Sequence, residues 1–568
     1  MKAFPGRLRF LSVIFLLFSL LLLSRLYFVQ VVSGEEYRLK ADKQYVRQDV
    51  NLFNRGTIYF ETKDGGPEPM AFVRSGFTVA INPSILADAQ SAYVQISSAI
   101  ALDRDAFLAK AAKKEDPYEE IAKRVDETTA KKIEALKISG VNIYTEKWRF
   151  YPAESLASHL IGFLGYKDDT LAGRYGLERY YEDTLARESG GLYINFFAEI
   201  FSNLKENIAG EAKHEGNIVA TIEPTVQSFL ERELKKIDET WNSDEVGGII
   251  INPKTGEIYA MGAYPTFNLN TFQNEEDPHV FSNPLVENVY EMGSIIKPLT
   301  VAAALDTGAI TASTTYDDKG YLILNNARIS NFDGKGRGIV DMQEVLNQSL
   351  NTGAAFAMFK MGKEAFVNYM KAYKVGDETG IDLPNETYGL IDNLDSGRDI
   401  ELATAAYGQG IAFTPIATVR ALSALGNGGL LINPHLVKKI NYKNGLSKTI
   451  AIDRGERVLK QETSEEITRM LVRVVDEALL GGTVKLPHYS VAAKTGTAQV
   501  VGTGGGGYQE GKYLHSFFGY FPAYDPEFLV FLFTMDPKGV RYASETLTHP
   551  FIDITKFLIN YYEVPFDR

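Results

Sequence analysis

The most continuous hydrophobic pattern in the chain lies near its N-terminus. Residues 10–23 are almost all apolar, and residues 26–32 continue the run beyond Arg25. Together they reach about the 20 residues that an α-helix needs to cross a bilayer. Basic residues precede the run, and such residues stay on the cytoplasmic side of a membrane. The pattern predicts a cytoplasmic tail and transmembrane anchor over residues 1–34, with a cleaved signal peptide and a buried core helix as the alternatives.

Residues 35–215 alternate between strand-like and helical patterns. Residues 45–60 alternate polar with β-branched and aromatic positions, which predicts a strand, whereas residues 84–136 are rich in Ala, Lys and Glu and predict helices broken at Pro117. The glycine-punctuated segment 161–165 returns to strand and turn. No phosphate-binding loop, histidine pair or paired carboxylates stand out here. We therefore predict a mixed α/β domain over residues 35–215 that serves as a non-catalytic pedestal for partner binding or dimerisation.

From residue 216 onward, two strands precede a long helical stretch, and three strands and a helix follow it. This order predicts one five-stranded antiparallel sheet flanked by helices, and so an α+β fold for residues 216–568. The predicted strands of the sheet are 247–252, 257–263, 489–501, 512–521 and 528–535, and the predicted helices are 224–241, 292–305, 343–374, 400–425 and 548–562.

Composition limits the functions that this chain can have. Its 568 residues, 45% hydrophobic and 23% charged, are typical of a folded protein of two or three domains. A net charge of −13 argues against nucleic acid as the main partner, because phosphate binding requires a basic surface. The absence of cysteine excludes disulfides, thiol nucleophiles and cysteine-ligated metals. The 7 histidines lack the spacing of metal ligands, so we predict no metal site and interpret His515 as structural.

The first candidate for chemistry is the pair Ser294 and Lys297, three residues apart at the start of an apolar helix. This spacing brings the hydroxyl and the amine onto one face of the helix. The partial positive charge of the helix N-terminus favours a neutral lysine and an ionising serine, which a serine nucleophile with a lysine base requires. One Ser-x-x-Lys match is weak evidence by itself in a chain of this length.

Two further motifs follow in order along the chain. Ser349-Leu350-Asn351 lies at a connection between predicted helices, and Lys494-Thr495-Gly496-Thr497 lies on a predicted strand. A second Lys-Thr-Gly begins at Lys254, but it precedes Ser294 and has the composition of a turn between two strands. The order, spacing and structural placement of the three motifs are hard to obtain together by chance.

Together these motifs resemble the penicilloyl-serine transferases, the superfamily of penicillin-binding proteins and serine β-lactamases. Segments upstream resemble the pedestal of class B, monofunctional penicillin-binding proteins, so the resemblance covers nearly the whole chain. These segments are Arg55-Gly56-Thr57-Ile58, Arg149-Phe150-Tyr151-Pro152 and Gly176-Leu177-Glu178. Residues 59–65 and Glu223 depart from the family pattern, outside the three motifs.

The resemblance implies a peptidoglycan D,D-transpeptidase that needs no metal or organic cofactor. Ser294 would attack the carbonyl of the penultimate D-Ala of a stem peptide, giving an acyl-enzyme and releasing the terminal D-Ala. Lys297 would act as the base, kept partly neutral by the helix end and by Lys494. Ser349 would relay a proton to the leaving amine, and Asn351 would hold Lys297 and the substrate amide.

The resemblance also assigns the substrate-binding groups to the third motif. The backbone N–H groups of Ser294 and Thr497 would form the oxyanion hole. Thr495 and Thr497, together with Lys494, would bind the terminal carboxylate of the substrate. Gly496 would leave room for the substrate along the strand edge.

Other functions share part of this pattern. A D,D-carboxypeptidase or endopeptidase would carry the same three motifs, and a non-enzymatic β-lactam sensor would keep the pocket for binding alone. A serine β-lactamase is disfavoured because it is typically shorter and needs a positioned deacylating base.

The resemblance further implies a location and partners. We expect a single-pass protein of the cytoplasmic (inner) membrane with an extracytoplasmic catalytic domain that binds peptidoglycan stem peptides and β-lactams. A polytopic glycosyltransferase and other proteins of the division or elongation machinery are the expected partners. The sequence does not distinguish septation from elongation and does not identify the acceptor amine.

Overall fold

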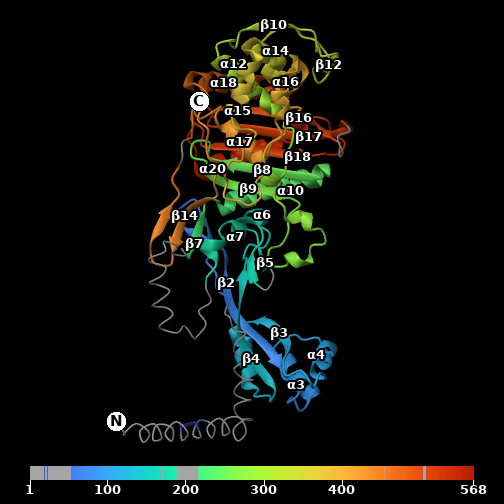
Figure 1. The fold of residues 1–568 in the computed structure, drawn as a ribbon, viewed down its shortest axis with the longest axis vertical. Helices are drawn as coiled ribbons and strands as arrows, with labels where there is room; N and C mark the ends of the chain where they lie inside the picture. The colour runs from blue at the N-terminus through green and yellow to red at the C-terminus, as the bar shows by residue number, and fades with distance from the viewer. Residues whose placement is uncertain are drawn as a thin grey trace, which may run out of the picture. The chain divides into compact units, whose positions relative to one another are not determined.

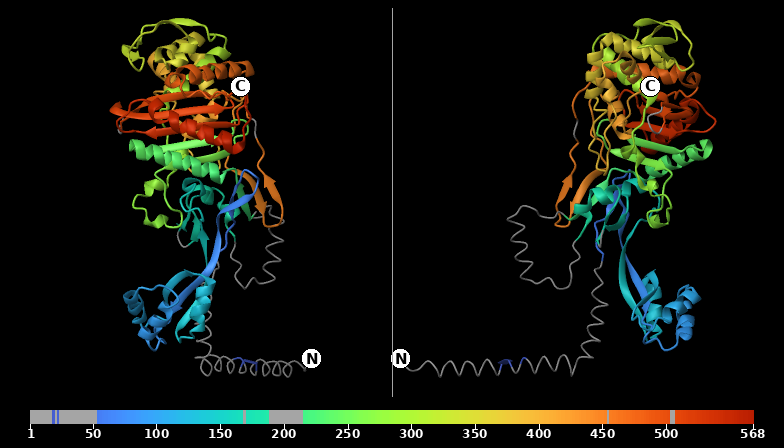
Figure 2. Two further views of the ribbon diagram at one scale, coloured as in Figure 1. Left: turned by 180° about the vertical axis from the view of Figure 1, so that it is seen from behind. Right: turned by 45° about the vertical axis from the view of Figure 1, so that its right-hand side comes forward.

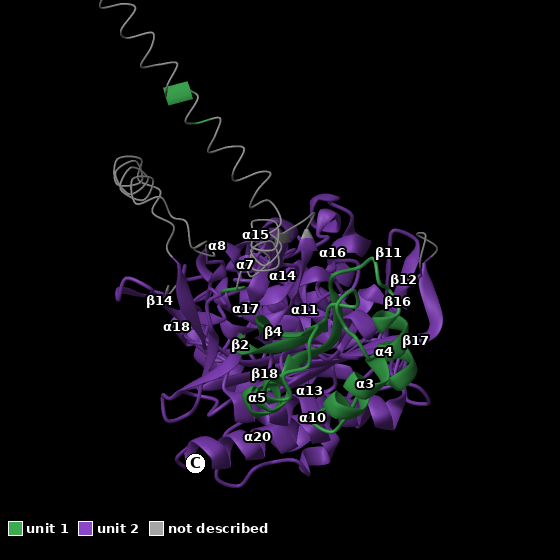
Figure 3. Ribbon diagram, turned by 90° about the horizontal axis from the view of Figure 1, so that it is seen from below, with its two compact units in different colours: residues 1–54, 73–148, 188–212 green, residues 55–72, 149–187, 213–568 purple. Residues whose placement is uncertain are grey.

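The computed structural model describes residues 53–167, 170–187, 215–452, 455–502 and 507–568, together with Phe18, Ser19 and Leu22. The predicted membrane anchor falls almost wholly outside these residues, and within them no helix is both long and apolar enough to span a bilayer. The chain divides into two compact units that interleave in sequence (Figure 3). Among the described residues, the smaller unit centres on residues 73–148, and the larger contains residues 55–72, 149–187 and those from 215 onward.

Over residues 73–148 of the smaller unit, three helices accompany a sheet in which β2 pairs with both β3 and β4. Each helix begins after an aspartate whose carboxylate accepts a backbone N–H of the first turn, which satisfies a donor that has no partner inside the helix. Buried apolar side chains such as Ile81, Ile96 and Phe107 form its core. The elements are β2 (Pro67–Ile81, shared with the larger unit), α3 (Ala89–Ser97), α4 (Arg104–Ala111), β3 (Glu119–Val125), α5 (Glu127–Ala135) and β4 (Val141–Phe150).

The helical prediction for residues 84–136 is wrong over β3. This segment follows Pro117 and pairs antiparallel with β2, with Ile81 opposite Glu119 and Phe77 opposite Val125. β3 lies at one end of the strand order, and charged residues are common on edge strands because they oppose edge-to-edge association. Its Lys and Glu content therefore mimics that of an exposed helix.

In the larger unit, a first sheet joins strands from distant parts of the chain. β1 (Ile58–Glu61) pairs in parallel with β7 (Gly216–Ala220) and antiparallel with the start of β2. β14 (Val437–Tyr442) pairs with β7, and β15 (Ser447–Thr449) pairs with β14. Nearby short elements are α6 (Ser158–Ile161), β5 (Leu164–Lys167), β6 (Thr170–Gly173), α7 (Gly176–Tyr180) and α8 (Glu182–Leu185).

The three upstream segments that resemble a pedestal meet at a buried ion cluster in this unit. The Glu178 carboxylate lies 2.6 Å from Arg55 Nε and 2.6 Å from Arg149 Nε, and these side chains are 0%, 2% and 4% exposed, respectively. Arg55 also pairs with Glu182 at 2.7 Å, and Arg149 donates to the Gly56 carbonyl at 2.7 Å. Buried charges require close partners of opposite charge, so the cluster holds the three segments together.

As predicted, the second sheet of the larger unit has five antiparallel strands, and their order is β16–β17–β18–β8–β9. β16, which carries the Lys494 motif, is an edge strand within the described part of the chain. Both views in Figure 2 show the strands from the red C-terminal part beside those from the green middle part. The strands are β8 (Glu245–Ile251), β9 (Ile258–Tyr264), β16 (Ala492–Val501), β17 (Tyr508–Phe521) and β18 (Phe528–Met535).

Both faces of this sheet are covered. Val530 and Leu532 of β18 pack in one cluster with α10 (Pro224–Trp241) and α20 (Thr548–Tyr562). Phe531 and Phe533 join the core on the opposite face. Burial on both faces explains why β18 is apolar at nearly every position instead of alternating.

A helical group lies beside the β16 edge of the sheet, where Figure 1 shows α12, α14, α16 and α18 together. The long helical stretches predicted from the sequence are several shorter helices. The remaining elements of this region are α11 (Pro284–Glu287), α12 (Lys297–Asp306), β10 (Thr315–Asp318), β11 (Tyr321–Leu324), β12 (Ala327–Ser330), β13 (Gly338–Asp341), α13 (Met342–Asn347), α14 (Asn351–Met361), α15 (Lys363–Ala372), α16 (Asp399–Ala405), α17 (Pro415–Ser423), α18 (Gln461–Arg473) and α19 (Ala543–Thr546).

Candidate active site

Ser294 lies in a single 3₁₀ turn, η4 (Gly293–Ile296), which leads directly into α12. Gly293 has a φ of 62°, a left-handed conformation that favours glycine. Its N–H donates to the Gly408 carbonyl at 2.9 Å, and the Ser516 hydroxyl donates to the Met292 carbonyl at 2.8 Å. These contacts hold the turn in place. The sequence predicts an α-helix from residue 292, whereas the chain makes a tighter 3₁₀ turn before α12 begins at Lys297.

The three sequence motifs meet in one hydrogen-bonded cluster. Lys297 Nζ lies 2.9 Å from Ser294 Oγ and 3.1 Å from Ser349 Oγ. Lys494 Nζ donates to the same Ser349 Oγ at 2.9 Å and to the Thr495 carbonyl at 2.9 Å. Each step between Ser294 and Lys494 is therefore within hydrogen-bond distance, as proton transfer requires.

Both lysines are removed from solvent, with Lys297 0% and Lys494 2% exposed. Burial disfavours a charged amine and, together with the positive charge of Lys494, lowers the pKa of Lys297 well below its usual value. Burial also lowers the pKa of Lys494 to about 7. The influence of Lys494 agrees with the prediction, but burial is the larger cause. A neutral Lys297 amine can accept the proton of Ser294.

Ser349 connects α13 to α14 in a left-handed conformation, with a φ of 56°. This conformation is unfavourable for a residue with a Cβ and persists only where its surroundings hold it. Lys297 Nζ donates to the Ser349 carbonyl as well as contacting its hydroxyl. Lys297 of the first motif therefore also fixes the backbone of the second motif.

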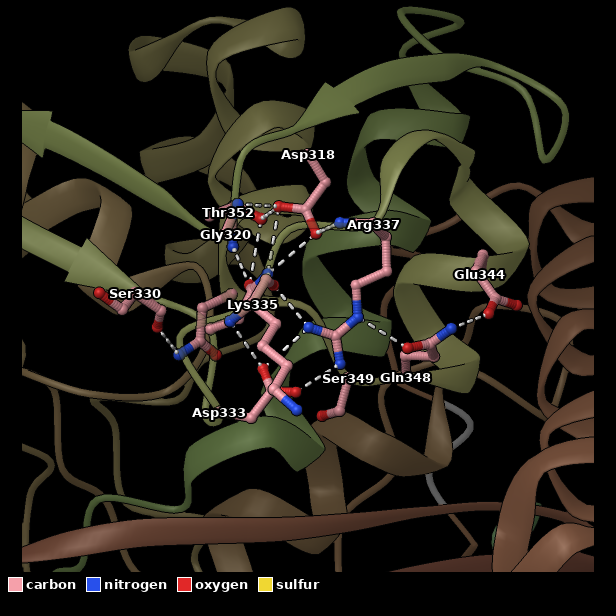
Figure 4. Close-up of polar contacts among 12 residues, drawn as sticks. Asp318, Gly320, Ser330, Asp333, Lys335, Arg337, Glu344, Gln348, Ser349 and Thr352 are labelled. Carbon is pink, nitrogen blue, oxygen red and sulfur yellow. Dashed lines mark hydrogen bonds and ion pairs between the residues drawn. The ribbon is translucent and has the colours of Figure 1, made fainter.

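Behind Ser349, the buried side chain of Asp318 organises the surrounding loop (Figure 4). Its carboxylate accepts from the Thr352 hydroxyl at 2.8 Å, from the Asn331 amide at 3.0 Å and from the Gly320 N–H at 2.9 Å. These bonds attach the start of α14 to the loop after β12. No spacing in the sequence relates Asp318 to Ser349, so sequence reasoning missed this residue.

Arg337 supports the same loop from its other side, between Asp333 and Gln348 in Figure 4. Its guanidinium pairs with Asp333 at 2.8 Å, and its Nε donates to Gln348 Oε1 at 2.8 Å, directly before Ser349. The Arg337 backbone N–H donates to Asp318 at 3.1 Å. Arg337 thus joins the carboxylate of Asp318 to the helix end that presents Ser349.

The side chain of Asn351, which the motif predicts on Lys297, is directed to another partner in this structure. The Asn351 amide Nδ2 donates to the Ser330 carbonyl at 2.8 Å, and among the described residues no hydrogen bond joins it to Lys297. Asn351 is the first residue of α14, so its side chain points to the loop that flanks the helix start. The Ser349 carbonyl takes the place predicted for Asn351 on the lysine.

β16 places the third motif against the Ser294 turn. A Cβ on Gly496 would lie 2.3 Å from Ser516 Oγ and 2.8 Å from the Met292 carbonyl oxygen. The glycine therefore allows β16 and the turn to approach closely, a different reason from the room for substrate that the motif predicts. The side chains of Thr495 and Thr497 are half-buried, and the Thr497 hydroxyl accepts the Ala543 N–H at 3.1 Å.

Comparison with known families agrees with this geometry. Residues 246–555 match the family model of the penicillin binding protein transpeptidase domain, and residues 53–220 match that of the penicillin-binding protein dimerisation domain. The chain belongs to the penicillin-binding proteins. The resemblance predicted from its motifs is confirmed.

Relatives of this penicillin-binding protein match it over almost its whole length. Stage V sporulation protein D of Bacillus subtilis (strain 168) is 31% identical over 557 residues, which cover 96% of this chain and 84% of the relative. Peptidoglycan D,D-transpeptidase FtsI of Escherichia coli (strain K12) is 25% identical over 551 residues, which cover 93% of this chain and 87% of the relative. The crystal structure of penicillin binding protein 2X from Streptococcus thermophilus has the same fold, with a TM-score of 0.74 and 21% identity over 91% of this chain and 81% of that chain.

Proposed function

We propose that this penicillin-binding protein is a serine-type peptidoglycan D,D-transpeptidase, which cross-links stem peptides through an acyl-serine intermediate and is inhibited by β-lactams. The observation that carries the proposal is the hydrogen-bonded chain from Ser294 through Lys297 and Ser349 to Lys494. Membership of the family and relatives named as D,D-transpeptidases support it. A serine beside a buried, neutral lysine is the activated nucleophile that acyl transfer requires.

In the acylation step, the neutral Lys297 amine takes the proton of Ser294 Oγ while this oxygen attacks the carbonyl carbon of the penultimate D-Ala. A C–O bond forms, and the peptide C–N bond to the terminal D-Ala breaks. The leaving nitrogen receives a proton from the Ser349 hydroxyl, which regains one from Lys297. The net result is the transfer of one proton from Ser294 to the released D-Ala, with Ser349 reprotonated and Lys297 neutral again.

The backbone N–H groups of Ser294 and Thr497 form the oxyanion hole in this proposal, a contribution of about 3–4 kcal/mol per donor in such sites. Lys494 and the hydroxyls of Thr495 and Thr497 bind the terminal carboxylate. Asn351 offers its side-chain oxygen to the substrate amide, because its nitrogen already donates to Ser330. Gly496 acts indirectly by keeping β16 close to the Ser294 turn.

In the second half-reaction the acyl group passes from Ser294 to an amine of a neighbouring stem peptide, which forms the cross-link and restores the serine. The proposal includes an anchor over residues 1–34 in the cytoplasmic membrane, a pedestal over residues 35–215 and an extracytoplasmic catalytic domain over residues 216–568. A polytopic glycosyltransferase and other proteins of septation or elongation are its proposed partners.

The proposal is tested by labelling the protein with a fluorescent penicillin and mapping the adduct by peptide mass spectrometry. We expect one adduct on Ser294, none in Ser294→Ala, and unchanged labelling in the control Ser313→Ala, which alters an exposed serine. An adduct that survives Ser294→Ala contradicts the mechanism. Incubation with a D-Ala-D-Ala stem peptide and an amine acceptor then distinguishes a cross-linked product from the hydrolysed product of a carboxypeptidase.

A further inference from the structure

His515 lies in β17 directly opposite Thr497 of the edge strand β16. The residue is 0% exposed, and both ring nitrogens contact one segment, residues 541–546. Nδ1 lies 2.9 Å from Thr546 Oγ1, and Nε2 lies 3.0 Å from the Arg541 carbonyl oxygen. One buried ring therefore holds the two ends of this segment, which we call the 541–546 segment.

The partners of the ring determine its tautomer. The Arg541 carbonyl can only accept, so Nε2 carries a proton and donates to it, whereas the Thr546 hydroxyl can either donate to Nδ1 or accept from it. Burial lowers the pKa of His515 to about 4, so the ring is neutral and Nδ1 accepts from the hydroxyl. With both nitrogens engaged inside the protein, the ring orients its neighbours and is not available for proton transfer to a substrate.

The 541–546 segment reaches the active site at two points. The Ala543 N–H donates to Thr497 Oγ1 at 3.1 Å. The Tyr542 ring meets the Phe332 ring edge-on, with 5.7 Å between centroids. Phe332 directly follows Asn331, whose side-chain oxygen accepts from the Thr352 backbone N–H at 3.2 Å. The segment thus connects the strand of the third motif with the loop that supports the second.

We propose that His515 is a positioning residue for acylation, which acts through the 541–546 segment to hold Thr497 against the reacting carbonyl. The inference rests on the proposed function, in which Thr497 supplies an oxyanion-hole N–H and a carboxylate-binding hydroxyl. β16 has a strand partner only at β17 in the described structure, so its Thr497 end needs a second support. The bond from Ala543 supplies that support, and His515 fixes the segment that makes the bond.

The test measures the second-order rate constant for acylation of the full-length protein by a fluorescent penicillin. The rate constant is normalised to the fraction of the protein that is labelled at the end of the reaction. His515→Phe keeps a ring but removes both polar contacts. We expect its rate constant to fall about 10- to 100-fold, because a misplacement of about 1 Å at a reacting centre costs up to about 100-fold. His515→Gln retains a nitrogen that can donate to Arg541 and should recover part of the loss.

A double-mutant cycle separates positioning from general destabilisation. Thr497→Val removes the acceptor of the Ala543 N–H, so we expect His515→Phe to add little to its effect, whereas independent effects multiply. His159→Phe is the matched control, because His159 is also buried and bonded to a carbonyl, that of Val280 at 2.9 Å. We expect this control to lower the unfolding temperature and leave the normalised rate constant unchanged.

An unchanged normalised rate constant in His515→Phe overturns the proposal, and so does a loss that multiplies in full with that of Thr497→Val. If His515→Phe does not fold, Thr546→Val, which removes the partner of Nδ1 and the longer bond from this hydroxyl to the Ala543 carbonyl at 3.3 Å, is tested against the same expectations. A failure to label Ser294 in the unaltered protein would instead contradict the proposed function, so the two failures are distinguishable.

Discussion

The positive charge of Lys494 should lower the pKa of Lys297 and so the pH above which Lys297 can act as a base. Lys297 Nζ and Lys494 Nζ contact the same Ser349 Oγ, at 3.1 Å and 2.9 Å, so the two nitrogens are at most about 6 Å apart. Two unit charges at this distance repel by about 2.8 kcal/mol at an effective dielectric constant of about 20. This repulsion disfavours the charged form of Lys297 and therefore lowers its pKa.

Lys494→Met removes this charge while keeping a side chain of similar length. A neighbouring positive charge disfavours protonation, so its removal raises the pKa of Lys297, although burial, the larger cause, still keeps it below its usual value. The rising limb of the acylation rate against pH should therefore move to higher pH. Lys494 is charged below its own pKa of about 7, so the difference is measured on the acid side of that value.

The assay is the rate of acylation by a fluorescent penicillin across a pH series. Lys494→Met also loses its contact with the carboxylate of the penicillin, so the maximum acylation rate falls. This maximum rate does not affect the pH at which the rate begins to rise. Lys494→Arg retains the charge and is the control. We expect the rising limb of its profile to lie at lower pH than that of Lys494→Met. A limb in Lys494→Met at the same pH as in the unaltered protein, or at lower pH, would refute the reasoning.

Two further predictions concern packing and stability. Gly496→Ala should slow acylation about 100-fold, because the added Cβ would lie 2.3 Å from Ser516 Oγ and 2.8 Å from the Met292 oxygen and must displace the Ser294 turn. Gly262→Ala on the opposite edge strand, where the nearest atom is 3.4 Å away, is the control, and an equal loss in both would contradict this explanation. Glu178→Gln should destabilise the larger unit by about 3–5 kcal/mol in urea unfolding, because it leaves Arg55 and Arg149 without their shared buried partner. Glu563→Gln, in the exposed pair with Lys63, should have little effect, and similar midpoints for the two variants would contradict the role of the cluster.

Local sequence patterns predicted many elements of the larger unit. α10 and α20 begin and end at residues 224–241 and 548–562, as their amphipathic periodicity predicts, and β18 occupies residues 528–535. These signals are local, so they can be read without knowledge of contacts. β3 has no such signal, because pairing with β2 decides its conformation against a helix-like composition.

The sequence by itself determined the family and predicted the groups that we propose carry the chemistry, because residue types at set spacings are local properties. Only the tertiary structure decided how these groups act together. The low pKa of Lys297 arises mainly from burial, the left-handed Ser349 depends on a lysine from another helix, and Asn351 contacts Ser330 instead of Lys297. The supports supplied by Asp318 and His515 have no pattern in the sequence. Desolvation and hydrogen-bond geometry depend on residues that meet only when the chain has folded.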